Sequence, residues 1–237
     1  MSSIEGKRIL VIGRGSGIAR AVVEAALAAG ARVVVAGRDP GKLAEAYRGE
    51  QVEVETVDVT DEASISALAG RLRQVDHVVS TASARARGKI GDLTAESVAL
   101  SFATKAIAPI LLAKHLASIM PPEGSFVLSS GVTATRPGVG MLAVAGTNGA
   151  VDAITRGLAI ELAPIRVNAI APGTIDTGAY DGLGDDAKTA LFTRRASNNP
   201  AGRVGTPGDV ADAVIFALTA DFVTGLSIPV DGGEILV

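Results

Sequence analysis

Cysteine and tryptophan are absent from this chain of 237 residues, and histidine occurs only as His77 and His115. Without cysteine, the chain has no disulfide framework, no thiol nucleophile and no cysteine-based zinc site. The two histidines lie far apart in the sequence, so they do not form a metal-ligand motif. We therefore expect no metal site.

Aromatic residues are also rare, at 3% of the chain, although hydrophobic residues reach 48%. Small aliphatic side chains, mainly alanine and valine, must therefore form the core. The only tyrosines are Tyr47 and Tyr180, and this scarcity limits which side chains can act as acids.

The chain lacks an excess of positive charge, because 22 Lys and Arg face 25 Asp and Glu, a formal net charge of -3. Binding along a nucleic-acid backbone needs a basic surface, so nucleic acid is not an expected partner. Uninterrupted apolar runs of about 18 residues are absent too, which predicts no membrane span. The N-terminus has no signal-peptide pattern, and we expect a cytoplasmic protein.

Short β-rich runs alternate with amphipathic stretches along the whole chain. This order predicts an α/β protein with a doubly wound, Rossmann-type parallel sheet of about seven strands and helices on both faces, in a single domain over 1–237. The predicted strands are 8–13, 31–37, 52–59, 76–82, 125–130, 166–172 and 226–233. The predicted helices are 17–30, 61–74, 93–120, 141–163 and 207–221.

The one long irregular stretch covers residues 173–209 and is rich in Gly, Asp and Asn. It follows a predicted strand, and ligands bind beyond the carboxyl ends of strands in open α/β sheets. We therefore predict a substrate loop here, with only short helices. The alternative is a surface insertion.

A glycine cluster, Gly13–Ala19, connects the first predicted strand to an alanine-rich helix, with the spacing G-x-x-x-G-x-A. Glycines let the backbone approach a pyrophosphate closely, and the helix N-terminus offers free N–H groups and a partial positive charge. In this strand–turn–helix context, the cluster predicts a dinucleotide site.

Several motifs make the chain resemble the short-chain dehydrogenase/reductase family over essentially its whole length. The family's T-G-x-x-x-G-x-G appears as residues 12–19, its Asp-Val as Asp58–Val59, and its N-N-A-G, in degenerate form, as 80–83. The stretch 166–177 and the terminal V-D-G-G match closely. The resemblance implies that the cofactor is held by Gly13, Arg14, Gly15, Ser16, Gly17, Ile18, Arg38, Asp58, Val59, Thr81, Ala82, Ser83, Pro172, Gly173, Ile175 and Thr177.

Charge at the end of the second predicted strand bears on the choice of nicotinamide cofactor. An acidic residue at this place suits the ribose 2′-hydroxyl of NAD, whereas NADP requires its 2′-phosphate to be balanced. Here Gly37 is followed by Arg38, and Arg14 lies in the glycine turn. Two guanidiniums favour NADP(H). Alternatively both are solvated surface charges, partly offset by Asp39.

The resemblance also implies catalysis by Asn, Ser, Tyr and Lys. Ser130, preceded by Ser129, stands at the serine position, whereas the Tyr-x-x-x-Lys pair is replaced by Val144 and Asn148. No tyrosine occurs between Tyr47 and Tyr180, so a shifted register does not restore the pair.

The asparagine position falls on Lys105 in one register and on Ala103 in another. In the first register, Asn and Lys have exchanged places, which makes Lys105 and Asn148 catalytic candidates beside Ser130. A partly buried lysine titrates below its ordinary range and can act as an acid near neutrality. A surface or interface lysine is the alternative. Thr147 and Tyr180 are weaker candidates, and neither histidine stands at a family site.

Two functions fit these motifs. One is an NADP(H)-dependent oxidoreductase that acts on a small carbonyl or alcohol through an atypical site; the other is a catalytically silent NADP(H)-binding sensor or scaffold. The resemblance further implies a homodimer or homotetramer, formed through the helices around 97–120 and 141–163 and through the C-terminal strand. Small residues on the second helix, Ala143, Gly146 and Ala150, favour close packing there.

Overall fold

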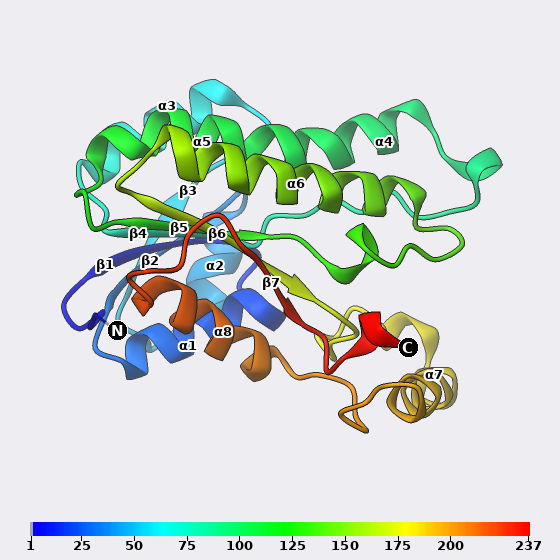
Figure 1. Cartoon of the computed structure of the whole chain (residues 1–237). Coiled ribbons are helices and arrows are strands. Elements are labelled where there is room, and N and C mark those ends of the chain that lie inside the picture. Colours follow the sequence, from blue (N-terminus) through cyan, green and yellow to red (C-terminus); the bar gives the residue numbers. More distant parts are fainter. Residues whose placement is uncertain (1) are drawn as a thin grey trace.

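A seven-stranded parallel sheet organises the computed structural model, which describes residues 2–237 (Figure 1). The strand order is β3-β2-β1-β4-β5-β6-β7, and β1 pairs with both β2 and β4. This confirms the predicted fold class. The strands are β1 (Arg8–Ile12), β2 (Arg32–Gly37), β3 (Val52–Thr56), β4 (His77–Ser80), β5 (Ser125–Ser129), β6 (Arg166–Pro172) and β7 (Ser227–Val230).

Helices cover both faces of the sheet, with α3, α5 and α6 on one side and α1, α2 and α8 on the other (Figure 1). Their bounds are α1 (Gly17–Ala28), α2 (Pro40–Ala46), α3 (Glu62–Leu72), α4 (Ala95–Phe102), α5 (Ala108–Leu116), α6 (Leu142–Glu161), α7 (Asp185–Ser197) and α8 (Pro207–Thr219). The short α2, which begins at a proline and is capped by Asp39, was not predicted.

Each central strand supplies side chains to two separate cores. In β1, Leu10 and Ile12 pack under α3 and α5, whereas Ile9 and Val11 pack against α1 and α8. Because successive side chains of a strand point to opposite faces, a strand covered on both faces is apolar throughout. This explains why the strands appear in the sequence as continuous apolar runs.

Phe126 in β5 is the largest of the fully buried side chains. Replacing Phe126 by alanine removes most of its apolar contacts and leaves a cavity, so we expect the free energy of unfolding to fall by about 3–5 kcal/mol. Phe222→Ala is the matched control, because Phe222 is fully exposed, and its effect should stay within about 0.5 kcal/mol. Urea unfolding of both variants measures the difference, and equal effects would contradict this account of the core.

The helical stretch Ala95–Ile119 is, among residues 2–237, the one helix long and apolar enough to cross a membrane by length and composition. Lys105 and Lys114 interrupt this stretch, so it contains no uninterrupted apolar run of about 18 residues, although its mean hydropathy remains high. Leu112 and Leu116 of this stretch are buried in the core between the helix and the sheet. A core helix meets the same length and composition test, so these two properties do not support a membrane span here.

The stretch 173–209 holds a longer helix than the short ones predicted, since α7 runs over 13 residues. Asp185 and Asp186 in its first turn and Arg194 and Arg195 in its last turn complement the helix dipole, which favours the helix although it buries no residue. An isolated parallel bridge between Ile175 and Gly205 holds the two ends of this stretch together.

Strand order reverses between β1 and β4, because the chain builds β2 and β3 on one side of β1 and β4 to β7 on the other. The carboxyl ends of all seven parallel strands meet at one edge, and the crevice at such a reversal is where open α/β sheets bind ligands. The glycine turn follows β1 and residues 81–83 follow β4, so both lie at this crevice.

Candidate active site

The glycine turn after β1 fits tightly against its neighbours. A Cβ atom on Gly13 would lie 2.5 Å from Thr81 Oγ1 and 2.6 Å from Ala19 Cβ. At Gly17 the φ angle is +55°, in the left-handed region that favours glycine, and a Cβ there would lie 3.1 Å from Thr177 Cβ. A side chain at either position would crowd these neighbours and push the turn out of its tight conformation.

The N-terminus of α1, which this turn presents, carries no internal cap. Ser16 at the N-cap position makes no side-chain capping bond, and the first turn holds no acidic residue. The first N–H groups of a helix have no partner within the helix, and they bind anions well. The residues present therefore fit the pyrophosphate of a nicotinamide dinucleotide.

The residues expected around adenine and its ribose lie at the ends of β2 and β3. Arg38 is exposed directly after β2. The Asp58 carboxylate accepts bonds from Thr60 Oγ1 at 2.7 Å and Thr60 N at 2.9 Å. These bonds, together with the charge of Arg38, lower the pKa of Asp58. Asp39 accepts from Lys42 N at 3.0 Å and caps α2, so its bonds go to the helix that follows it.

Most of the predicted cofactor residues line one continuous hollow along the carboxyl edge. Those around the nucleotide half are Gly13, Arg14, Ser16, Gly17, Ile18, Thr81, Ala82, Ser83 and Thr177. The adjoining half is lined by Pro172, Gly173 and Ile175. Gly15 instead packs on α2, where its Cβ would lie 3.2 Å from a Leu43 methyl carbon. Arg38, Asp58 and Val59 are outside both linings, towards β2 and β3.

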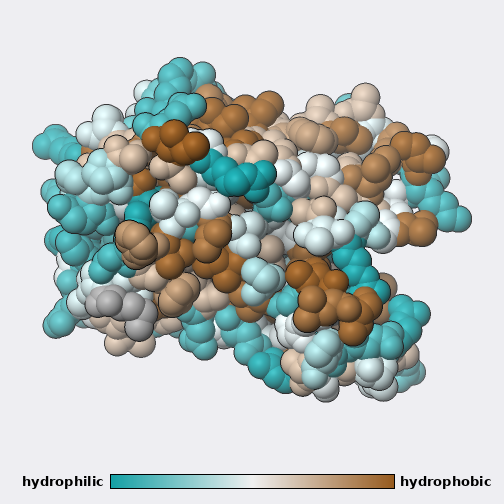
Figure 2. All heavy atoms as spheres, viewed as in Figure 1, coloured by the Kyte–Doolittle hydropathy of each residue, from teal (hydrophilic) through white to brown (hydrophobic). Residues whose placement is uncertain are grey.

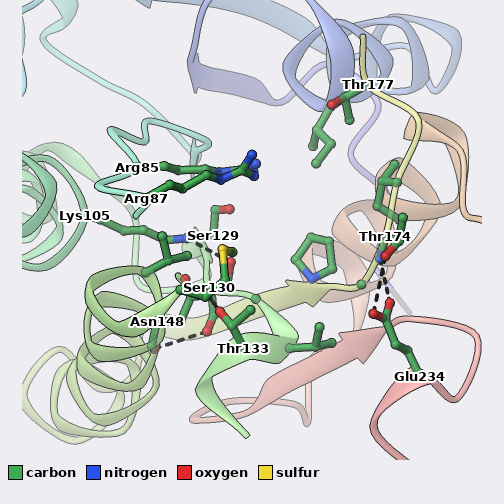
Figure 3. Close-up of a pocket in the computed structure, with 18 of the residues that line it drawn as sticks. Arg85, Arg87, Lys105, Ser129, Ser130, Thr133, Asn148, Thr174, Thr177 and Glu234 are labelled. Carbon is green, nitrogen blue, oxygen red and sulfur yellow. Dashed lines mark hydrogen bonds between the residues drawn. The ribbon is translucent and has the colours of Figure 1, made fainter. Parts of the chain in front are cut away.

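Lys105 enters this hollow from the helix layer and is only 5% exposed (Figure 3). Its Nζ donates to the backbone carbonyl of Ser130 at 3.0 Å. Burial, and to a smaller extent the nearby charge of Arg85, lower the pKa of Lys105 to about 7, against an opposing effect of Asp152. A buried amine with this pKa exchanges protons near neutrality.

A π-helical segment, Ala103–Ile107, places Lys105 between α4 and α5. Pro109 follows in the first turn of α5. Proline has no N–H to donate to the carbonyl four residues earlier, here that of Lys105, and its ring crowds that carbonyl. A helix that widens before a proline satisfies this constraint, and such π-bulges occur often at functional sites.

The hydroxyl of Ser130 is engaged within the protein. Its Oγ donates to Asp152 Oδ1 at 2.6 Å and lies 3.2 Å from the Asn148 carbonyl. The same Asp152 oxygen accepts from Ser227 Oγ at 2.7 Å, which ties β7 to α6. Ser129, one position earlier, lines both halves of the hollow.

Val144 and Asn148 lie one turn apart on α6, and both line the hollow. Asn148 is 2% exposed, and its Nδ2 donates to Thr133 Oγ1 at 2.6 Å (Figure 3). Asn148 Oδ1 is buried and has no hydrogen-bond partner within residues 2–237. The structure thus brings Asn148 and Lys105 to one cavity, and leaves the buried amide oxygen of Asn148 without a hydrogen bond from the described residues.

The weaker candidates divide between the cavity and the rest of the chain. Tyr180 lines the cavity and packs edge-on against Phe192. Thr147 is buried, and its hydroxyl donates back to the Val144 carbonyl at 3.0 Å.

Both histidines lie outside the cavity lining and contact other residues. Burial lowers the pKa of His77 to about 4, and its ring contacts Ser125 Oγ at 2.8 Å. His115 contacts Glu62 at 2.9 Å. Over residues 2–237, no three His, Cys, Asp or Glu side chains are grouped so as to hold a metal ion.

Four charged residues of the cavity were not singled out from the sequence: Arg85, Arg87, Arg195 and Glu234. Figure 3 shows Arg85 and Arg87 running side by side into the cavity from the loop after β4. Glu234, near the C-terminus, accepts from Thr174 N at 2.8 Å and from Arg195 at 3.0 Å. The sequence S-A-R-A-R-G over residues 83–88, directly after β4, could have pointed to Arg85 and Arg87 as residues of the site.

The hollow is open on one side of the molecule. In Figure 2 the surface is recessed between the upper helix layer and the lower part that carries α7 and the C-terminus. The residues that line this outer recess include Arg87, Thr133, Met141, Tyr180, Arg195 and Glu234. A small molecule therefore has a path from solvent to Lys105.

A parallel sheet with a glycine turn and an uncapped helix at its strand-order reversal defines a dinucleotide-binding protein of the doubly wound α/β class. A family model described as enoyl-(acyl carrier protein) reductase matches residues 12–234. The chain belongs to the short-chain dehydrogenase/reductase family, and the relatives it matches include oxidoreductases.

Three similar proteins illustrate the range of the family. The short-chain dehydrogenase/reductase malC of Malbranchea aurantiaca is 31% identical over 98% of this chain and 96% of its own length. The inactive 2-(S)-hydroxypropyl-CoM dehydrogenase 2 of Xanthobacter autotrophicus is 36% identical over 90% of this chain and 98% of its own. A solved small-chain dehydrogenase in complex with NADPH is 32% identical, with a TM-score of 0.81, and the match covers 98% of this chain and 100% of that one.

Proposed function

We propose that the protein is an NADP(H)-dependent oxidoreductase that interconverts a carbonyl and an alcohol, with Lys105 as the proton donor. The observation that carries this proposal is the placement of Lys105, a buried amine with a pKa near neutrality between the nucleotide and substrate halves of one cavity. General acid catalysis needs such a group within reach of the reacting oxygen.

The cofactor, when bound, supplies or accepts the hydride. In this proposal the glycine turn and the uncapped start of α1 hold its pyrophosphate, and Thr177, which faces Gly17, closes the site. Arg14 and Arg38 bind the 2′-phosphate, and Asp58–Val59 border the adenine. The solved NADPH complex of a 32% identical relative supports the choice of NADP(H).

During reduction, the carbonyl carbon gains the hydride while the electron pair of the C=O π bond moves to oxygen. That oxygen takes a proton from the Lys105 ammonium, which becomes a neutral amine and regains a proton from solvent. One N–H of Lys105 stays on the Ser130 carbonyl, and two remain for the substrate oxygen. Alcohol oxidation follows the reverse path.

In the same proposal, Val144 and Asn148 replace the family's tyrosine and lysine. Valine has no proton to donate, whereas Asn148 Oδ1 accepts a bond from the substrate or from a water molecule. Ser130 is a positioning residue, because its carbonyl orients Lys105 while its hydroxyl binds Asp152.

NADPH oxidation, followed by absorbance over a panel of ketones, aldehydes and quinones, tests the proposed function. We expect turnover with at least one class of carbonyl and none without substrate. Tight NADPH binding without oxidation of any panel member would contradict it.

A catalytically silent NADP(H)-binding protein is the second candidate function. Two observations favour it: the Ser130 hydroxyl is bound within the protein, and a 36% identical relative is described as inactive. The two candidates differ in one readout, because a silent protein binds NADPH but oxidises none with any carbonyl.

The pH dependence of turnover offers a further prediction. An ordinary lysine stays protonated to about pH 10, but Lys105, with its pKa lowered to about 7, loses its proton just above neutrality. We expect the rate of carbonyl reduction at saturating NADPH to fall about tenfold per pH unit above pH 7, while alcohol oxidation rises. Steady-state rates between pH 5.5 and 9.5 test this, and a reduction rate that stays constant to pH 9 would contradict it.

We also propose a cytoplasmic homo-oligomer that pairs through the layer of α4, α5 and α6. Apolar side chains exposed on this layer support the pairing: Leu100, Phe102, Ile107 and Ile110. Of the small residues predicted at the contact, Ala143 is buried inside the chain, whereas Gly146 is exposed.

A further inference from the structure

Two arginines in the loop after β4 stand at the junction of the two halves of the cavity. Arg85 and Arg87 line both the part with the glycine turn and the part with Ser130, Val144 and Asn148. Arg87 extends further, into the outer recess beside Thr133. Figure 3 shows their guanidinium groups close together and aimed into the open space.

Neither guanidinium has a carboxylate partner within residues 2–237. Arg195, which lines the same cavity, is by contrast paired with Glu234 at 3.0 Å. Desolvation by the cavity wall, and then the charges of Arg87 and Arg14, lower the pKa of Arg85. Both arginines are still exposed to solvent, so water partly screens their repulsion. Two like charges held side by side without a counter-charge repel each other, and an anion bound between them relieves that repulsion.

The charge balance of the cavity is opposite to that of the whole chain. The formal net charge is -3. The cavity nevertheless gathers Arg85, Arg87, Lys105 and Arg195 against the carboxylate of Glu234, which is already bound to Arg195 and Thr174. A cleft lined by one sign of charge concentrates ligands of the opposite sign.

We propose that this cavity selects carbonyl substrates that carry a compact anionic group, held by the guanidiniums of Arg85 and Arg87. The inference rests on the proposed oxidoreductase function and names its substrate class. The anion occupies the outer side of the arginine pair, and the carbonyl points inward to Lys105. Carboxylate, phosphonate and sulfonate oxygens all suit the planar guanidinium donors.

Cofactor binding does not account for both arginines. The turn at Gly13 and the start of α1 already offer N–H groups to the pyrophosphate, and Arg14 lies within that turn. Arg87 lines the outer recess with Thr133 and Met141, on the side of the cavity that the glycine turn does not reach. Arg87 therefore reaches the substrate half, and Arg85 lies beside it at the junction of the two halves.

The test uses the full chain saturated with NADPH and matched probes of equal length: 4-oxopentanoate, its neutral amide, 3-oxobutylphosphonate and 3-oxobutylsulfonate. The immediate quenching of NADPH fluorescence on mixing reports binding before turnover, and the slower oxidation of NADPH that follows reports turnover. Arg85→Gln, Arg87→Gln and the double variant are compared with Arg73→Gln, which removes an exposed arginine just before β4, at the opposite edge of the sheet.

We expect at least one charged probe to bind about tenfold or more tightly than the neutral amide, with a preference that falls as salt rises. Each single variant should lose about tenfold in affinity for that probe and the double variant more, while the NADPH dissociation constant and binding of the amide change less than threefold. The comparison among carboxylate, phosphonate and sulfonate identifies the group. Arg73→Gln should behave as the wild type.

Three outcomes overturn the inference: equal binding of charged and neutral probes, variants that leave the preference unchanged, or variants that weaken NADPH as much as the probe. Anion binding without NADPH oxidation would contradict the proposed oxidoreductase while leaving the anion site in place. NADPH oxidation by neutral carbonyls, with no preference for charged probes, would contradict the anion site and leave the proposed oxidoreductase function in place.

Discussion

Replacing Lys105 by methionine is expected to lower kcat for carbonyl reduction by about 10² to 10⁴, the usual contribution of a general acid. Methionine fills a similar volume but has no proton and no charge. The NADPH dissociation constant should change less than threefold, because the side chain of Lys105 bonds to Ser130 and lies beyond the glycine turn. Stopped-flow single turnovers and fluorescence titration measure the two quantities separately.

Lys105→Arg distinguishes proton donation from electrostatic stabilisation. Arginine keeps the positive charge but stays protonated at all accessible pH values, so it donates a proton poorly. We expect Lys105→Arg to be nearly as slow as Lys105→Met and to lose the fall in rate above pH 7. Activity near that of the wild type in either variant would exclude Lys105 as the donor.

Loss of folding does not explain the expected effect of Lys105→Met. The pKa of Lys105 is lower in the folded chain than in the unfolded chain, so the unfolded chain binds more protons between pH 7 and 10.5. The resulting cost to stability is full below pH 7 and disappears above pH 10.5. Methionine removes this cost, and we expect its free energy of unfolding at pH 7 to equal or exceed that of the wild type.

The double variant Arg14→Gln, Arg38→Gln is expected to weaken NADPH binding about 100-fold while NADH binding changes less than threefold. Both side chains are exposed at the carboxyl ends of β1 and β2. A charge-assisted bond to a phosphate contributes about 1.5–3 kcal/mol, so two such bonds correspond to at least this factor. Only NADPH carries the 2′-phosphate, and the effect should therefore be specific to it.

Arg32→Gln provides the control for this experiment, because Arg32 lies at the amino end of the same strand that Arg38 follows. It removes the same charge far from the binding edge and should leave both dissociation constants unchanged. Isothermal titration with each cofactor measures them. Tighter binding of NADH than of NADPH by the wild type would rule out the proposed cofactor preference.

The strands and the nucleotide turn were predictable because their determinants are local. A strand buried on both faces must be apolar throughout, and a turn that approaches a pyrophosphate needs glycine. The observed β1, β2 and β6 agree with the predicted ranges to within one residue at each end. The helix α7 was underestimated, because charges at its two ends stabilise it without an apolar face.

Residues that meet only through the fold were less predictable. The sequence shows Lys105 and Asn148 as departures from a family pattern, but only the structure shows them at one cavity, with Lys105 bound to the Ser130 carbonyl. The hydroxyl of Ser130 donates a hydrogen bond to Asp152, which lies 22 positions away in the sequence. Burial of Lys105 follows from packing around the π-helical segment, which composition does not reveal.

By itself, the sequence determined the class of fold, the glycine turn after β1 and the absence of a tyrosine from α6, since each depends on residue types along a short stretch. The tertiary structure decided which charges share the cavity. Arg85, Arg87, Arg195 and Glu234 come from three separate segments that meet only at the carboxyl edge of the sheet. Electrostatic interactions depend on distance in space and on burial, and folding alone sets both.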